Sequence, residues 1–94
     1  MSYSTISNWN VTSWTDEMEA LARDKFVPMI MSSGASKVQM VRTGDLSFAV
    51  VTEYEDADKA EKAQSRIAEI RSQATTDLPM TMADVSSGAV FANG

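Results

Sequence analysis

Residues Val38–Tyr54, VQMVRTGDLSFAVVTEY, contain two short extended runs joined at Gly44-Asp45 and flanked by two helical patterns. Side chains alternate between the two faces of a strand, so the run Phe48-Ala49-Val50-Val51 makes both faces of the second strand apolar. In a chain of 94 residues, one layer of helices covers only one of these faces. The sequence therefore predicts a hairpin in a sheet whose second face is covered by another subunit.

The elements around the hairpin are predicted from capping residues, from the spacing of apolar residues, and from glycine and proline. Pro28 is expected to kink or interrupt the first helix near Phe26-Val27, and Gly34 to end it. Exposed charge in the first hairpin strand favours an edge position. The expected elements are a strand Tyr3–Val11, a helix capped by Thr12 or Ser13, hairpin strands Ser36–Arg42 and Leu46–Tyr54, a helix from Asp56 or Ala57 to about Ala74, a loop Thr75–Pro79, and a strand from Met80 to about Phe91 broken near Ser86-Ser87-Gly88.

This order, β-α-β-β-α-β, is that of a split βαβ or ferredoxin-like unit. We expect an α+β fold with one antiparallel four-stranded sheet and two helices on one face. A chain near this length removes roughly 60 to 68% of its unfolded surface from water on folding, which allows one modest core. Residues 1–94 are therefore expected to form a single domain.

The composition argues against several classes of chemistry. Thirteen acidic and eight basic side chains give a net charge of −5 without a basic cluster, which disfavours nucleic acid as a partner. The chain has no Cys and no His, so it lacks thiolate nucleophiles, disulfides and the commonest general base and metal ligand. The acidic residues near Glu55-Asp56 are interpreted as a solvated strand end and helix start. No metal and no cofactor is predicted.

The sequence also gives an expectation about location. No apolar run approaches the ~20 residues that a membrane-spanning helix needs. The segment Met1-Ser2-Tyr3-Ser4-Thr5 lacks the basic start and apolar stretch of a secretory signal. We therefore expect a cytoplasmic protein with no membrane partner.

The chain resembles the subunits of the dimeric α/β barrel superfamily, which includes antibiotic-biosynthesis monooxygenase-like proteins. The resemblance implies a homodimer in which two sheets face each other and the helices lie outside, as the two-sided strand also predicts. Haem-degrading members use a histidine ligand, and the lack of His argues against that activity here. The pattern covers almost the whole chain and is carried by Trp9-Asn10-Val11, Trp14, Phe26-Val27-Pro28, Gly34-Ala35, and Val50 through Glu55-Asp56 before an Ala-rich helix.

The resemblance also implies candidate site residues, because cofactor-independent oxygenases of the monooxygenase-like branch bind an aromatic substrate between sheet and helices. Asn8 or Asn10 would hydrogen-bond a substrate oxygen. Trp14 would stack on the substrate ring, and Arg42 would stabilise an oxyanion. The side chains expected to line the pocket are Trp9, Trp14, Met40 and Tyr54.

These residues also have a purely structural interpretation. The two Trp side chains would fill the core or a dimer interface, Tyr54 would cap a strand end, and Arg42 would lie in solvent beside the turn. The enzyme hypothesis requires instead that Asn8 or Asn10 converges with Trp14 and Arg42 on one enclosed pocket.

Two functional hypotheses follow, and enzymatic activity stays open between them. The first is a non-catalytic small dimeric barrel protein that holds a small apolar ligand. The alternative is a cofactor-independent monooxygenase or isomerase acting on an aromatic or polyketide-like metabolite. An RNA-binding sheet of the same topology is disfavoured, because the chain is acidic and its central strands lack paired aromatic residues.

Overall fold

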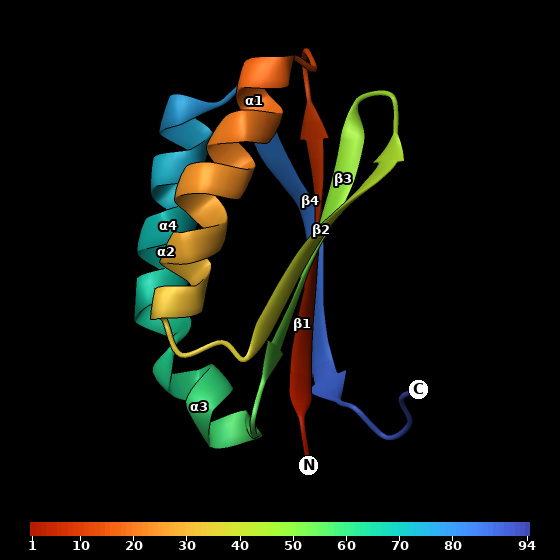
Figure 1. Cartoon of the computed structure of the whole chain (residues 1–94), viewed down its shortest axis with the longest axis vertical. Helices are drawn as coiled ribbons and strands as arrows, with labels where there is room; N and C mark the ends of the chain where they lie inside the picture. The colour runs from red at the N-terminus through yellow and green to blue at the C-terminus, as the bar shows by residue number, and fades with distance from the viewer.

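The computed structural model describes residues Met1–Gly94. One antiparallel sheet has the strand order β2-β3-β1-β4, and every helical segment lies on the same face of it, which leaves the other face bare (Figure 1). The α+β ferredoxin-like prediction is confirmed, and so is the edge position of the first hairpin strand. The elements are β1 (Tyr3–Val11), α1 (Asp16–Leu21), η1 (Ala22–Phe26), α2 (Val27–Ser32), β2 (Lys37–Gly44), β3 (Ser47–Tyr54), α3 (Ala57–Lys62), α4 (Gln64–Asp77) and β4 (Met80–Ala89).

None of these helices is both long enough and apolar enough to cross a membrane.

The first helix begins later than predicted. Thr15 caps it, with its hydroxyl accepting a hydrogen bond from the Met18 amide at 3.2 Å. The predicted caps at Thr12 or Ser13 are wrong, because the chain is still held to the sheet there: the Thr12 amide donates to the Pro79 carbonyl at 3.0 Å.

The predicted interruption of the first helix is confirmed. The turn before Pro28 is a π-helix, η1, in which the Val27 amide donates to the Ala22 carbonyl. Pro28 has no amide hydrogen to continue the regular pattern, and π-type turns absorb such a break. The helix ends at Ser32, and Gly34 follows the cap residue Ser33 with a φ of 107°, a conformation that favours glycine.

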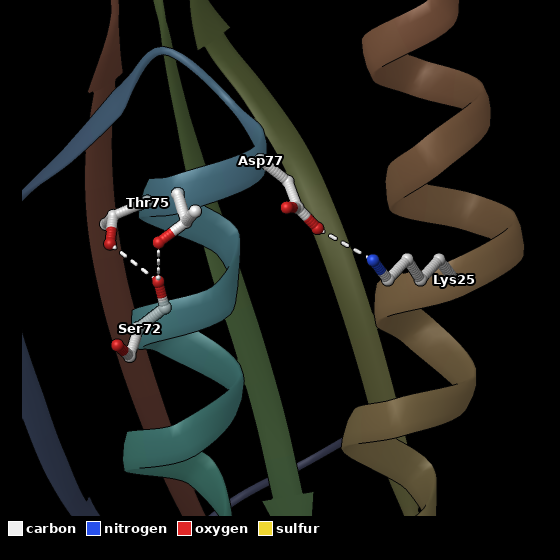
Figure 2. A network of polar contacts seen from close by, with 5 residues as sticks. Lys25, Ser72, Thr75 and Asp77 are labelled. Carbon is white, nitrogen blue, oxygen red and sulfur yellow. Dashed lines mark hydrogen bonds and ion pairs between the residues drawn. The ribbon is translucent and has the colours of Figure 1, made fainter.

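The second helix is longer than predicted and is divided at Ala63 into α3 and α4. The end predicted at Ala74 and the loop predicted from Thr75 are wrong, because α4 continues to Asp77. In the last turn, the hydroxyls of Thr75 and Thr76 donate to the Ser72 carbonyl at 2.9 and 3.1 Å (Figure 2). Asp77 is also anchored to η1, with Lys25 Nζ at 2.7 Å from Asp77 Oδ2.

The irregularity of the last strand lies at a different residue from the one predicted. Asn8 pairs with Asp84 and Trp9 with Met82, so Ala83 is an extra residue in a β-bulge. The break predicted at Ser86-Ser87-Gly88 is wrong, because these residues pair in regular register with β1. β4 then ends at Ala89, before the predicted end near Phe91.

The core lies between the sheet and the helices. On the sheet side, the core contains Trp9, Val50 and Tyr54. On the helix side, it contains Ile67 and Ile70 of α4. All five side chains are buried.

The other face of the sheet, called the outer face below, carries a second apolar set. Val51 pairs with Ile6, and Ala49 pairs with Val41, so these four residues lie on one side. Ile6 is 42% exposed and Val41 is 47% exposed. The prediction that strand β3 is apolar on both faces is confirmed.

Candidate ligand-binding site

A groove of about 350 Å³ opens between the first helix and the β2–β3 hairpin. Trp14 precedes α1, and its side chain faces the hairpin because the chain turns back over the sheet at the Thr15 cap. The principal walls are Trp14, Met18, Met40, Arg42, Phe48 and Leu78. This mixture of aromatic rings and flexible Met side chains is typical of a site for an apolar ligand.

A stack of planar groups forms one wall of the groove. The Trp14 and Phe48 rings meet edge to face at 6.0 Å between centroids. Phe48 in turn lies nearly parallel to Trp9, with centroids 6.3 Å apart and planes at 10°. The Arg42 guanidinium carbon lies over the Trp14 ring, 4.2 Å from its centroid. The rings are thus held in fixed orientations before any ligand binds.

Two polar groups of the aromatic wall, those of Trp14 and Arg42, already have partners within the protein, whereas the Arg23 side chain at the rim of the groove is 69% exposed. Trp14 Nε1 donates to Glu19 Oε2 at 2.7 Å. Arg42 donates to the carbonyls of Gly44 and Asp45, at 3.2 and 2.9 Å, which fixes its guanidinium over Trp14. The groove therefore offers an apolar surface and shape, with few free hydrogen-bonding groups.

The structure brings together only part of the predicted site. Trp14, Arg42 and Met40 all line the groove. Asn8 and Asn10 do not reach it, because both lie on the outer face of β1, where Asn8 Nδ2 donates to Asp84 Oδ1 at 2.7 Å. The polar set that the enzyme hypothesis requires is therefore divided between the two faces of the sheet.

The other two predicted pocket residues lie deeper. Trp9 is buried behind Phe48, and its Nε1 donates to Ser7 Oγ at 2.8 Å. Tyr54 is 1% exposed and lines neither the groove nor the cavity behind it. It packs in the core at the end of β3.

A second, smaller cavity of about 60 Å³ lies behind the groove, between the sheet and α4. Its lining is apolar except for Ser7, Thr52 and Arg71, none of which was predicted from the sequence as a site residue. A signal for two of them existed, because Ser7 and Thr52 occupy the same strand faces as Trp9 and Val50. Both are only 4% exposed, and burial lowers the pKa of the Arg71 guanidinium, an effect that Tyr54 partly opposes.

Comparison with known proteins shows the same fold in several solved structures, although no family model and no curated protein matches the sequence. SnoaB, a cofactor-independent oxygenase from Streptomyces nogalater, superposes with a TM-score of 0.74 at 14% identity, over 98% of this chain and 95% of that one. A dimeric ferredoxin-like protein from an uncultured marine organism gives a TM-score of 0.69 at 14% identity, over 100% and 98%. An ethyl tert-butyl ether D (EthD) family protein from Bacillus halodurans gives 0.71 at 11% identity, over 97% and 100%. The resemblance predicted from the sequence is thus confirmed at the level of the fold.

Proposed function

We propose that the protein is a homodimeric α/β barrel protein, with residues 1–94 as one subunit, that binds a small, mainly apolar aromatic molecule. The observation that carries the proposal is the groove of about 350 Å³ beside Trp14. The aromatic rings of the groove are held in place, and Trp14 Nε1 and the Arg42 guanidinium already have partners within the protein. A preorganised apolar site of this kind loses little entropy on binding a flat ligand.

The outer face supports the proposed dimer. Ile6 and Val41 expose apolar surface beside Ala49 and Val51, and no element of the chain covers them. A structural neighbour with a TM-score of 0.69 is itself described as a dimeric ferredoxin-like protein. Packing two such faces together would remove the exposed apolar residues from water.

Light scattering tests the dimer. The wild-type protein should be a dimer at micromolar concentration, and Val41→Lys should give a monomer because it places a charge on the buried face. Ala68→Lys, an equal change on the exposed surface of α4, should stay dimeric. A monomeric wild-type protein, or equal association of the two variants, contradicts this assembly.

Calorimetric titration with 2-naphthamide, a neutral bicyclic probe, tests the groove. Trp14→Leu should weaken binding by about tenfold, the upper range for a lost aromatic contact. Phe91→Leu serves as the control, because Phe91 is 93% exposed and lies outside the groove. Absence of binding, or equal loss in both variants, contradicts the proposed site.

A cofactor-independent oxygenase is the second candidate, favoured by the similarity in fold to SnoaB, which is described as such an enzyme. In this reaction a phenolic substrate would itself supply electrons to dioxygen: a ring methylene becomes a ketone, and the second oxygen atom leaves as water. Arg42 would have to act without Asn8 or Asn10, which lie on the outer face. Oxygen uptake with a polyphenolic anthrone, in buffer with a chelator and no flavin, should then fall in Arg42→Gln; no uptake by the wild-type protein removes this candidate.

A further inference from the structure

We infer that the cavity behind the groove binds the carboxylate of an acidic aromatic ligand, with Arg71 as the group that recognises its charge. This inference rests on the proposed function and names the class of ligand, an aromatic monocarboxylic acid. The two cavities are adjacent, because they share the lining residues Ala22, Met40, Phe48 and Leu78. The inference requires that one molecule reaches from the groove into the inner cavity past these side chains.

The polar groups of the inner cavity can all donate hydrogen bonds, and none of the residues lining it is acidic. Arg71 takes part in none of the protein's ion pairs and donates to no protein acceptor. The buried Thr52 also lines the cavity, and its hydroxyl can donate a hydrogen bond. Ser7 Oγ accepts from Trp9 Nε1, which leaves its own hydrogen free to donate. A cation beside two hydroxyl groups that can donate, with no acidic residue in the lining, matches a carboxylate.

The setting of Arg71 explains why it is unpaired. Along α4 it follows the buried Ile70 and lies on the opposite flank from Asp77, whose carboxylate is held by Lys25 of η1. Arg71 is half-buried and stays protonated at neutral pH, because an arginine pKa lies far above that range. A charge that is partly removed from water and has no partner is unfavourable, so a bound anion would stabilise it.

The volumes of the two cavities indicate which cavity holds the carboxylate and which holds the ring. The inner cavity of about 60 Å³ is well below the roughly 150 Å³ of a protein cavity that holds a benzene ring. A carboxylate fits this space and a bicyclic ring does not. The ring therefore lies in the groove of about 350 Å³, with the flexible Met40 side chain at the boundary.

A matched pair of probes tests this inference. 2-Naphthoic acid and 2-naphthamide have nearly the same shape but differ in charge, and each is titrated calorimetrically into the wild-type dimer. The wild-type protein should bind the acid at least about tenfold more tightly, the range expected for a hydrogen bond to a charged group. The net charge of −5 works against nonspecific binding of the acid, so the preference has to come from a local site.

Variants of arginine residues on α4 test which side chain causes the preference for the acid over the amide. Arg71→Gln should remove the preference for the acid and leave the affinity for the amide unchanged. Arg66→Gln, on the exposed side of the same helix and paired with Glu69, should retain the full preference. Arg71→Lys keeps the charge but loses the planar fork, so it should retain part of the preference. Unchanged thermal unfolding of the Arg71 variants confirms that they are folded.

The outcomes separate this inference from the proposed function. Equal wild-type affinity for acid and amide, or a preference that survives Arg71→Gln, overturns the assignment of Arg71. The groove still stands in that case if amide binding depends on Trp14. If neither probe binds, the proposed function fails and the assignment fails with it.

Discussion

The guanidinium carbon of Arg42 lies 4.2 Å from the centroid of the Trp14 ring. The same guanidinium donates to the carbonyls of Gly44 and Asp45. One side chain therefore closes the β2–β3 turn and fixes the aromatic wall of the groove. The hairpin that organises the sheet thus also positions the candidate site.

Replacing Arg42 should weaken both the fold and the groove. Arg42→Gln removes the cation over Trp14 and the hydrogen bonds to the turn, which should lower the free energy of unfolding by about 1 kcal/mol. Urea unfolding followed by Trp fluorescence measures this change. Arg66→Gln is the control, because Arg66 is exposed, pairs with the nearby Glu69 and lies outside the groove. Equal stability of the two variants contradicts the role of Arg42.

Gly34→Ala should destabilise the protein through its backbone alone. The φ of Gly34 is 107°, yet nothing lies within 4 Å of the position where a Cβ would be added. The loss should be about 1 to 2 kcal/mol, the range for an L-residue forced into a left-handed conformation. Gly88→Ala has equally open space without a positive φ, so it should be nearly neutral. Thermal unfolding of the pair separates the conformational effect from any steric one.

Asp56 should stabilise the start of α3 as its N-cap. Its carboxylate oxygen Oδ1 accepts from the Lys59 amide at 2.8 Å. Asp56→Ala should lower the unfolding free energy by about 1 kcal/mol, whereas Asp56→Asn keeps a capping oxygen and should change little. Urea midpoints compare the two variants. A loss with Asn as large as with Ala would point to charge, rather than capping, as the source of the effect.

The Lys59 ammonium should titrate above its ordinary range. Its side-chain hydrogen bond to Glu55 at 2.5 Å, followed by the attraction of that carboxylate, raises its pKa. A raised folded-state pKa means that the stabilisation is fully present at neutral pH and is lost as the pH rises through that pKa. Glu55→Gln should bring the pKa of Lys59 down in an NMR titration. An unchanged pKa in this variant contradicts the assigned cause.

Much of the fold could be predicted because some residues determine the local backbone conformation by themselves. Pro28 and Gly34 interrupt and end the first helix by their own covalent geometry, so the sequence is sufficient there. The cap at Thr15 and the end of α4 at Asp77 depend instead on distant partners. The Thr12 amide binds the Pro79 carbonyl, and Asp77 pairs with Lys25, contacts that no local pattern contains.

The candidate site also contains some residues that could be predicted from the sequence and others that could not. Trp14 and Arg42 meet beside the hairpin, whereas Asn8 lies on the opposite face of the sheet because strand residues alternate. That alternation was visible in the sequence and could have separated Asn8 from Trp9. Arg71 could not be selected in this way, because an Arg on an exposed helix and an unpaired Arg at a cavity have the same sequence pattern.

The most direct test of the groove is an NMR titration of the indole N–H groups. The protein has two Trp residues and should give two indole signals, which Trp14→Phe assigns by removing one. Addition of 2-naphthamide should move the Trp14 signal most strongly, because its ring forms the wall of the groove. Saturation binding that leaves the Trp14 signal in place, or no binding at millimolar probe, contradicts the account.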